Sequence, residues 1–191
     1  YYPPPYLFSW LEAFLEYQRE NGSLPDWLAP QGRQGKNTTE SDQETSAVQA
    51  AYLLSQLTSA EWLLQEIKGQ PLINRLEKAL TYLLQNRWSL HFGLIRGAHT
   101  ADWGDIDLVD ADQQAIFTDR RTHWTVDIYD QAMFYLACQN LAVLFQQINR
   151  PDKSLFWRQK AAGIKRAVQK WLWDPKQGYF LIHRHCDSLR H

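Results

Sequence analysis

The sequence is poor in cysteine, balanced in charge and free of long apolar runs. Its 191 residues include two cysteines, Cys138 and Cys186, which stand far apart and favour a reducing compartment, so we expect a cytoplasmic protein. Lys and Arg total 20 against 21 Asp and Glu. This balance argues against partners such as nucleic acid or an anionic membrane, because binding to either needs a basic field. No apolar segment approaches the roughly 20 residues of a membrane span.

Several signatures of chemistry are missing as well. The chain has no glycine-rich phosphate loop, no Ser-His-Asp signature and no repeat of fixed period. The segment "HRHC" places His183 and His185 on one face of an expected strand. A zinc site needs four ligands, however, and the sequence holds no second cluster of suitable residues. We therefore expect no cofactor.

Apolar residues at helical spacing are abundant. The expected helices cover residues 5–20, 40–57, 59–67, 72–88, 126–148 and 151–173, and a short strand is expected over 179–184. Ser41, three residues before Glu44, has the spacing of a capping box. Asp127 and Asp130 are acids at the start of a helix, where they favour its dipole, and we expect them to serve in capping that helix. Because strands do not alternate with helices, the pattern predicts an all-α fold.

One segment interrupts the helical pattern. The residues "GAHTADWGDIDLVDADQQ" (97–114) hold five aspartates, two glycines and one tryptophan, inside an expected loop from about Ser89 to Thr125. A loop of this length is typical of a functional site. Trp103 and Trp124 lie in it, where an indole ring can stack on the C–H face of a sugar. Packing into the core is the other interpretation of each ring.

Three segments together resemble a known superfamily. The segment "ADWGD" (101–105) is similar to the acidic loop of the six-hairpin, (α/α)6-barrel glycosidases. This superfamily includes amylo-alpha-1,6-glucosidases, glucoamylase-like enzymes and the disaccharide phosphorylases, which carry "DWND" there. The segment "RAVQKWLWDPKQGYF" (166–180) resembles a helix end and turn of the same superfamily, and "VDIYDQAMFYLACQNLAVL" (126–144) resembles the helix between them.

The resemblance implies an architecture. It implies an all-α, partial (α/α)6 toroid of helical hairpins, with a long loop on the active face and a short strand or β-hairpin near the C-terminus. Residues 1–191 would form a single catalytic domain. The chain begins at "YYPPPY" without methionine, so we expect a fragment whose first and last hairpins lie outside it.

The resemblance also implies catalytic roles. In the "DWND" loops the second aspartate is the general acid, which makes Asp105 the acid and Asp102 a ligand of a sugar hydroxyl. Trp103 would form an apolar wall that raises the pKa of the acid by desolvating its charged form. Gly104 replaces the asparagine of that pattern, so one polar contact is missing. The expected function is inverting hydrolysis of an O-glycosidic bond in an α-glucoside-like substrate, with the second catalytic carboxylate outside this chain.

Four further residues are candidates for substrate binding. Trp124 could stack on the sugar, and His99 and His123, which flank the acidic segment, could bond its hydroxyls. Tyr129 could point into the same pocket. The alternatives without a role in binding are histidines on the surface and a tyrosine that packs in the core. The expected partner is an oligosaccharide or glycoside, and the sequence leaves the oligomeric state open.

Other interpretations of the acidic segment stay open. Aspartates also serve solvated turns, where they cap the chain. Asp105, Asp107, Asp110 and Asp112 offer hard oxygen ligands for a structural calcium ion, although their spacing differs from the EF-hand template. A glycoside phosphorylase would use phosphate in place of water. The alternative from another class is a non-enzymatic helical-hairpin binding or scaffold module, against which the long loop argues.

Overall fold

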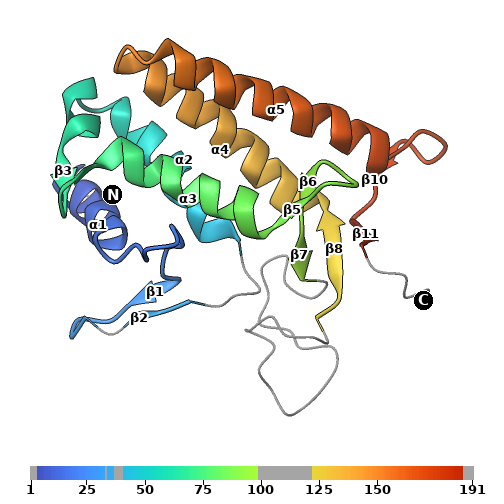
Figure 1. Ribbon diagram of the computed structural model, residues 1–191, viewed down its shortest axis with the longest axis horizontal. Coiled ribbons are helices and arrows are strands. Elements are labelled where there is room, and N and C mark those ends of the chain that lie inside the picture. The colour runs from blue at the N-terminus through green and yellow to red at the C-terminus, as the bar shows by residue number, and fades with distance from the viewer. Residues whose placement is uncertain (1–3, 33, 37–40, 99–121, 187–191) are drawn as a thin grey trace.

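The computed structural model describes residues 4–32, 34–36, 41–98 and 122–186 (Figure 1). The helices among these residues are α1 (Pro4–Glu16), α2 (Asp42–Ser55), the 3-10 helix η1 (Ala60–Leu64), α3 (Leu72–Asn86), α4 (Ile128–Gln147) and α5 (Pro151–Trp171). Each α-helix overlaps a segment whose apolar periodicity predicts it, and only α1 extends beyond its segment, by one residue at its start. α5 begins at Pro151, a position where the missing N–H of proline leaves no helical hydrogen bond unmade.

Short strands separate the helices. They are β1 (Trp27–Leu28), β2 (Gln34–Gly35), β3 (Glu66–Ile67), β4 (Gln70–Pro71), β5 (Trp88–Ser89), β6 (Leu94–Ile95), β7 (Gly97–Ala98), β8 (Trp124–Asp127), β9 (Trp173–Asp174), β10 (Tyr179–Phe180) and β11 (His183–His185). Within the described residues they form five antiparallel sheets, four of them two-stranded and one ordered β11-β8-β7. The expectation of an all-α partial toroid is therefore wrong, because the described chain is mixed α/β.

The two-stranded sheets form where the chain reverses direction beside a helix. Gly93 (φ 67°) lies in the turn between β5 and β6, and Gly178 (φ 74°) in the turn between β9 and β10. Lys68 and Gly69 both have positive φ and turn the chain between β3 and β4. Turns of this kind favour glycine and bring the flanking residues into hydrogen-bonding register. For this reason the segment 59–67, expected to be one helix, is a 3-10 helix followed by a strand.

The core lies between α2, α3, α4 and α5. α3 buries the predicted stripe, which includes Leu76, Leu80 and Leu83. α4 is buried on much of its circumference and packs along α5, whose Trp157 is fully buried (Figure 1). Burial of one aromatic or large aliphatic side chain contributes about 1.5–3 kcal/mol, so this helix pair is a main source of stability.

The helix starts follow two different rules. Asp127 caps α4 as expected, because its carboxylate accepts the backbone N–H of Asp130. The capping box at α2 is wrong. Ser41 makes no side-chain capping bond, and its hydroxyl instead donates to Asp130 Oδ1 at 2.8 Å. Glu44 turns away from the helix start and accepts the backbone N–H of Leu24 at 2.9 Å.

Candidate functional site

The three-stranded sheet gathers three distant parts of the chain. β7 pairs with β8 so that Ala98 lies opposite Trp124, and β11 pairs with β8 so that His183 lies opposite Asp127. β8 then runs directly into the start of α4 (Figure 1). Ala98, the last described residue before position 99, and Trp124, which is among the first described after position 121, are therefore neighbours on one sheet. The candidate functional site lies at this sheet and at the start of α4.

Two buried carboxylates lie at the start of α4. Asp127 and Asp130 are 1% and 5% exposed. An added Cβ at Gly97 would lie 2.5 Å from Asp130 Oδ2 and 3.0 Å from Asp127 Oδ2, so both carboxylates press against the bare backbone of β7. Ser41 donates to the other oxygen of Asp130, across 89 residues of sequence. The positive end of α4 favours negative charge at this position.

Two arginines surround the indole of Trp124. The guanidinium carbon of Arg87 lies 4.8 Å from the ring centroid, and that of Arg96 lies 5.1 Å from it. Arg87 is 3% exposed, and Arg96 is half-buried. Burial lowers the pKa of the Arg87 guanidinium below its ordinary value. The carboxylates of Asp130 and Glu44 oppose that effect from nearby, which places Arg87 within electrostatic reach of both acids.

A buried ion network adjoins this cluster. Lys36 Nζ lies 3.1 Å from both Asp26 Oδ1 and Glu44 Oε1. Glu44 has no exposed surface, and burial raises the pKa of its carboxyl above the ordinary value. Burial alone would lower the pKa of Lys36, but the two carboxylates outweigh it and the net direction is upward. Lys36 is therefore charged at neutral pH, and the network continues through Glu44 toward Arg87.

Three of the expected site residues lie in the described chain. Trp124 is the first residue of β8, half-buried, with the two arginines at its ring. His123 precedes it and Tyr129 is the second residue of α4; both are half-buried. The structure thus brings all three to the segment that joins β8 to α4. His183 and His185 share one face of β11 as predicted, with ring centroids 5.2 Å apart.

The remaining expected site residues lie outside the described residues. They are the catalytic candidates Asp102 and Asp105, the substrate-binding candidates Trp103 and His99, and the calcium candidates Asp107, Asp110 and Asp112. Ala98 and Thr122, which flank residues 99–121, are described. Ala98 pairs with Trp124 and follows Gly97, whose backbone lies against the carboxylates of Asp127 and Asp130.

Sequence reasoning missed most of the charged cluster. Arg87 follows the last residue of α3 and Arg96 lies between β6 and β7, and neither position carried a local signal of function. The capping-box spacing did single out Ser41 and Glu44, but it assigned them to a helix cap. Their true partners lie on other elements, so only the tertiary structure could reveal them.

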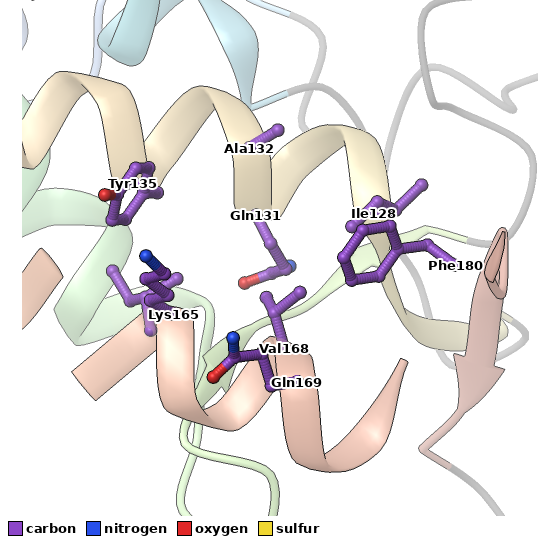
Figure 2. Close-up of a pocket in the computed structure, with 9 residues that line it drawn as sticks. Ile128, Gln131, Ala132, Tyr135, Lys165, Val168, Gln169 and Phe180 are labelled. Atoms are coloured by element: carbon purple, nitrogen blue, oxygen red, sulfur yellow. The ribbon is translucent and has the colours of Figure 1, made fainter. Parts of the chain in front are cut away.

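Two grooves are found in the described part of the chain, and the second of them includes Asp26 of the ion network in its lining. One, of about 280 Å³, runs between α4 and α5 and is lined mainly by apolar side chains such as Ile128, Val168 and Phe180 (Figure 2). Gln131 reaches it from α4, but its amide is bonded to both backbone groups of Ile95 and serves structure. A second groove of about 210 Å³ lies beside Trp10, between α1 and α2. Because the α4–α5 groove has no carboxylate in its lining, it offers no acid for catalysis.

Three further observations bear on the assignment of the chain. No group of three or more His, Cys, Asp or Glu side chains among the described residues is arranged to hold a metal ion. In that same part of the chain, no helix combines the length and the apolar character that crossing a membrane requires. No protein-family model matches the sequence, and no curated protein matches it.

Proposed function

We propose that this chain carries part of a glycosidase active site that hydrolyses an O-glycosidic bond of an α-glucoside. The observation that best supports this proposal is the pairing of Ala98 with Trp124. Ala98 and Trp124, which stand on either side of "ADWGD" in the sequence, are thereby neighbours close to the buried side chains of Arg87, Asp127 and Asp130. Buried charges are costly, and they concentrate at functional sites more often than elsewhere. The resemblance of "ADWGD" to the acidic loop of six-hairpin glycosidases supplies the chemistry.

In this proposal Asp105 is the general acid. It protonates the leaving glycosidic oxygen, while Asp102 bonds a sugar hydroxyl and Trp103 excludes water from the acid. Trp124, with its ring already held by two guanidinium groups, forms a rigid wall at the base of the site.

The test separates the acid from the ligand by the leaving group of the substrate. The protein is assayed on an α-linked disaccharide and on α-glucosyl fluoride, whose leaving group needs little protonation. Asp105→Asn should lower kcat/KM on the disaccharide by about 10²–10⁴-fold and spare the fluoride. Asp102→Asn should lower kcat/KM on both substrates alike. Asp152→Asn, an exposed aspartate on α5, is the matched control and should change neither.

The outcomes that contradict the proposal are distinct. If Asp102→Asn shows the leaving-group dependence instead, the two roles are exchanged. If neither variant loses more than a few-fold, the segment has no catalytic role and the proposal fails. Product analysis in phosphate buffer adds a second arm, because a sugar phosphate as product would identify a phosphorylase rather than a hydrolase.

A further inference from the structure

The two arginines beside Trp124 are placed by backbone geometry. Arg87 follows α3, and its carbonyl accepts the backbone N–H of Arg96 at 2.7 Å. The β5–β6 hairpin, in which Trp88 pairs with Ile95, therefore continues by one more pair and sets the two arginines side by side. Trp124 on β8 contacts both guanidinium groups through its ring. Two like charges are thus held close together by three separate elements.

One guanidinium nitrogen of each arginine lacks a hydrogen-bond acceptor within the described residues. Arg87 Nη1 and Arg96 Nε are both buried, and no acceptor lies within bonding distance of either atom there. The two acids that act on Arg87 already bond elsewhere, since Asp130 accepts from Ser41 and Glu44 pairs with Lys36. A buried charge without a bonded partner is costly, and arginine cannot escape the cost by losing its proton.

We propose that Arg87 and Arg96 bind one carboxylate or phosphate group of a small ligand. A guanidinium presents N–H donors in a planar fork that matches the oxygens of either group. Stacking on Trp124 holds both forks in place before the ligand arrives, which lowers the entropy lost on binding. The anion supplies the missing acceptors and offsets the repulsion between the two arginines. Histidine, lysine and the α4 carboxylates are not required for this contact.

The inference also narrows the substrate of the proposed glycosidase, and in that respect it rests on the proposed function. The cation pair lies beside Trp124, the ring proposed to form a wall of the sugar site. A glycoside with a carboxylate or phosphate on its sugar or its aglycone would fit both features. The anion site itself stands on the arginine geometry alone and can be measured without any turnover.

The experiment is a thermal-unfolding titration of the protein with inorganic phosphate and, separately, with D-glycerate. Sodium chloride keeps the ionic strength constant, so that general screening does not change. The midpoint of unfolding, Tm, should rise with the logarithm of ligand concentration for at least one of the two anions. The anion that raises it identifies the group as phosphate or carboxylate.

Variants decide whether that rise comes from this site. R87M and R96M should abolish the ligand-dependent rise, while R158M, at an exposed arginine on α5, should retain it. R87K keeps the charge but loses the planar fork, so the rise should be reduced. Phosphate also stabilises proteins in general by exclusion from their surface, but that effect is common to all the variants. R96M, at a half-buried residue, carries the same test if R87M does not fold.

The proposal also predicts the stability of the ligand-free variants. R87M should unfold no more easily than the wild type, because it replaces a buried cation whose Nη1 group has no acceptor with an apolar chain of similar length. No rise of Tm with either anion in the wild type would overturn the proposal. A rise that persists in both R87M and R96M would overturn it equally. If anion binding is confirmed and glycoside hydrolysis is absent, the anion site at Arg87 and Arg96 is confirmed and the proposed glycosidase function is wrong.

Discussion

The ion network around Lys36 gives the clearest prediction for single residues. Lys36→Met leaves Asp26 and Glu44 buried together without their cation. Removal of one partner of a buried ion pair costs about 3–5 kcal/mol. Glu44→Gln should cost less, because Lys36 keeps Asp26 as a partner. Urea denaturation of both variants and of the double variant measures the coupling between the residues. Single variants within about 0.5 kcal/mol of the wild type would show that the network contributes little.

The same lysine predicts a dependence on alkaline pH. The carboxylates of Glu44 and Asp26 raise the pKa of Lys36 above the ordinary value of 10.5. A folded-state pKa above that of the unfolded chain means that the stabilisation is complete below pH 10.5. It is then lost as pH rises through the folded value. The difference in unfolding free energy between the wild type and Lys36→Met should therefore narrow above pH 10.5. A difference in unfolding free energy that stays constant to higher pH would contradict this prediction.

At this scale the sequence predicts local partners and misses distant ones. The capping of α4 by Asp127 was predictable, because donor and acceptor are three residues apart. The bond from Ser41 to Asp130 spans 89 residues, and no local pattern contains it. Arg87 shows the same limit, since its role depends on Arg96 and Trp124 rather than on its neighbours in α3. The roles of Asp102 and Asp105 stay predictions.

Two glycine substitutions give a prediction about how the helices and turns are positioned. Gly163 lies inside α5, and an added Cβ there would meet no atom within 4 Å. Gly163→Ala should therefore stabilise the protein by about 0.5–1 kcal/mol, because alanine loses less backbone entropy in a helix. Gly22 has φ of 99°, and an added Cβ would lie 2.5 Å from the carbonyl oxygen of Lys78. Gly22→Ala should destabilise the protein by more than about 1 kcal/mol.

Denaturation of the two glycine variants tests the positions of the elements independently of any function. Gly163→Ala serves as the matched control for Gly22→Ala, because the added group is the same methyl. Equal effects from the two substitutions would show that the contact between Gly22 and α3 is misplaced. A destabilised Gly163→Ala would show that α5 meets another surface at that residue.

Elements were predictable in proportion to their length. Thirteen or more residues of apolar periodicity defined each α-helix, and the expected helices overlap the observed ones. Most strands have two residues, which is too short for an alternating pattern to show. Only the glycines at the turns, such as Gly93 and Gly178, carried a signal of reversal. This is why the fold was expected to be all-α and is in fact mixed.

At the scale of the whole molecule, the site depends on assembly of the sheet β11-β8-β7. Its strands come from three places in the chain, and two of its pairings involve β8. The sequence shows the acidic segment as an interruption, but it does not show that Arg87 lies at Trp124 or that Ser41 and Asp130 are bonded beside β7. Long-range pairing of short strands carries too little local information for such a prediction.

The surface of the whole molecule predicts self-association. Leu136 and Val143 are exposed and lie seven residues apart on α4, so they share one face of a helix that is otherwise mostly buried. Leu53 on α2 and Phe156 on α5 are exposed as well. Exposed apolar surface of this kind favours association with another surface. We expect the 191-residue chain to sediment as more than one species at micromolar concentration.

Sedimentation velocity across a range of concentrations measures this association. The double variant Leu136→Lys and Val143→Lys should shift the distribution toward the monomer, because each charge would have to be desolvated in the interface. Leu90→Lys is the control, since Leu90 is 92% exposed on a turn between β5 and β6 and lies away from α4. It should leave the distribution unchanged. If the wild type is a monodisperse monomer at all concentrations, the prediction of self-association through the α4 face is wrong.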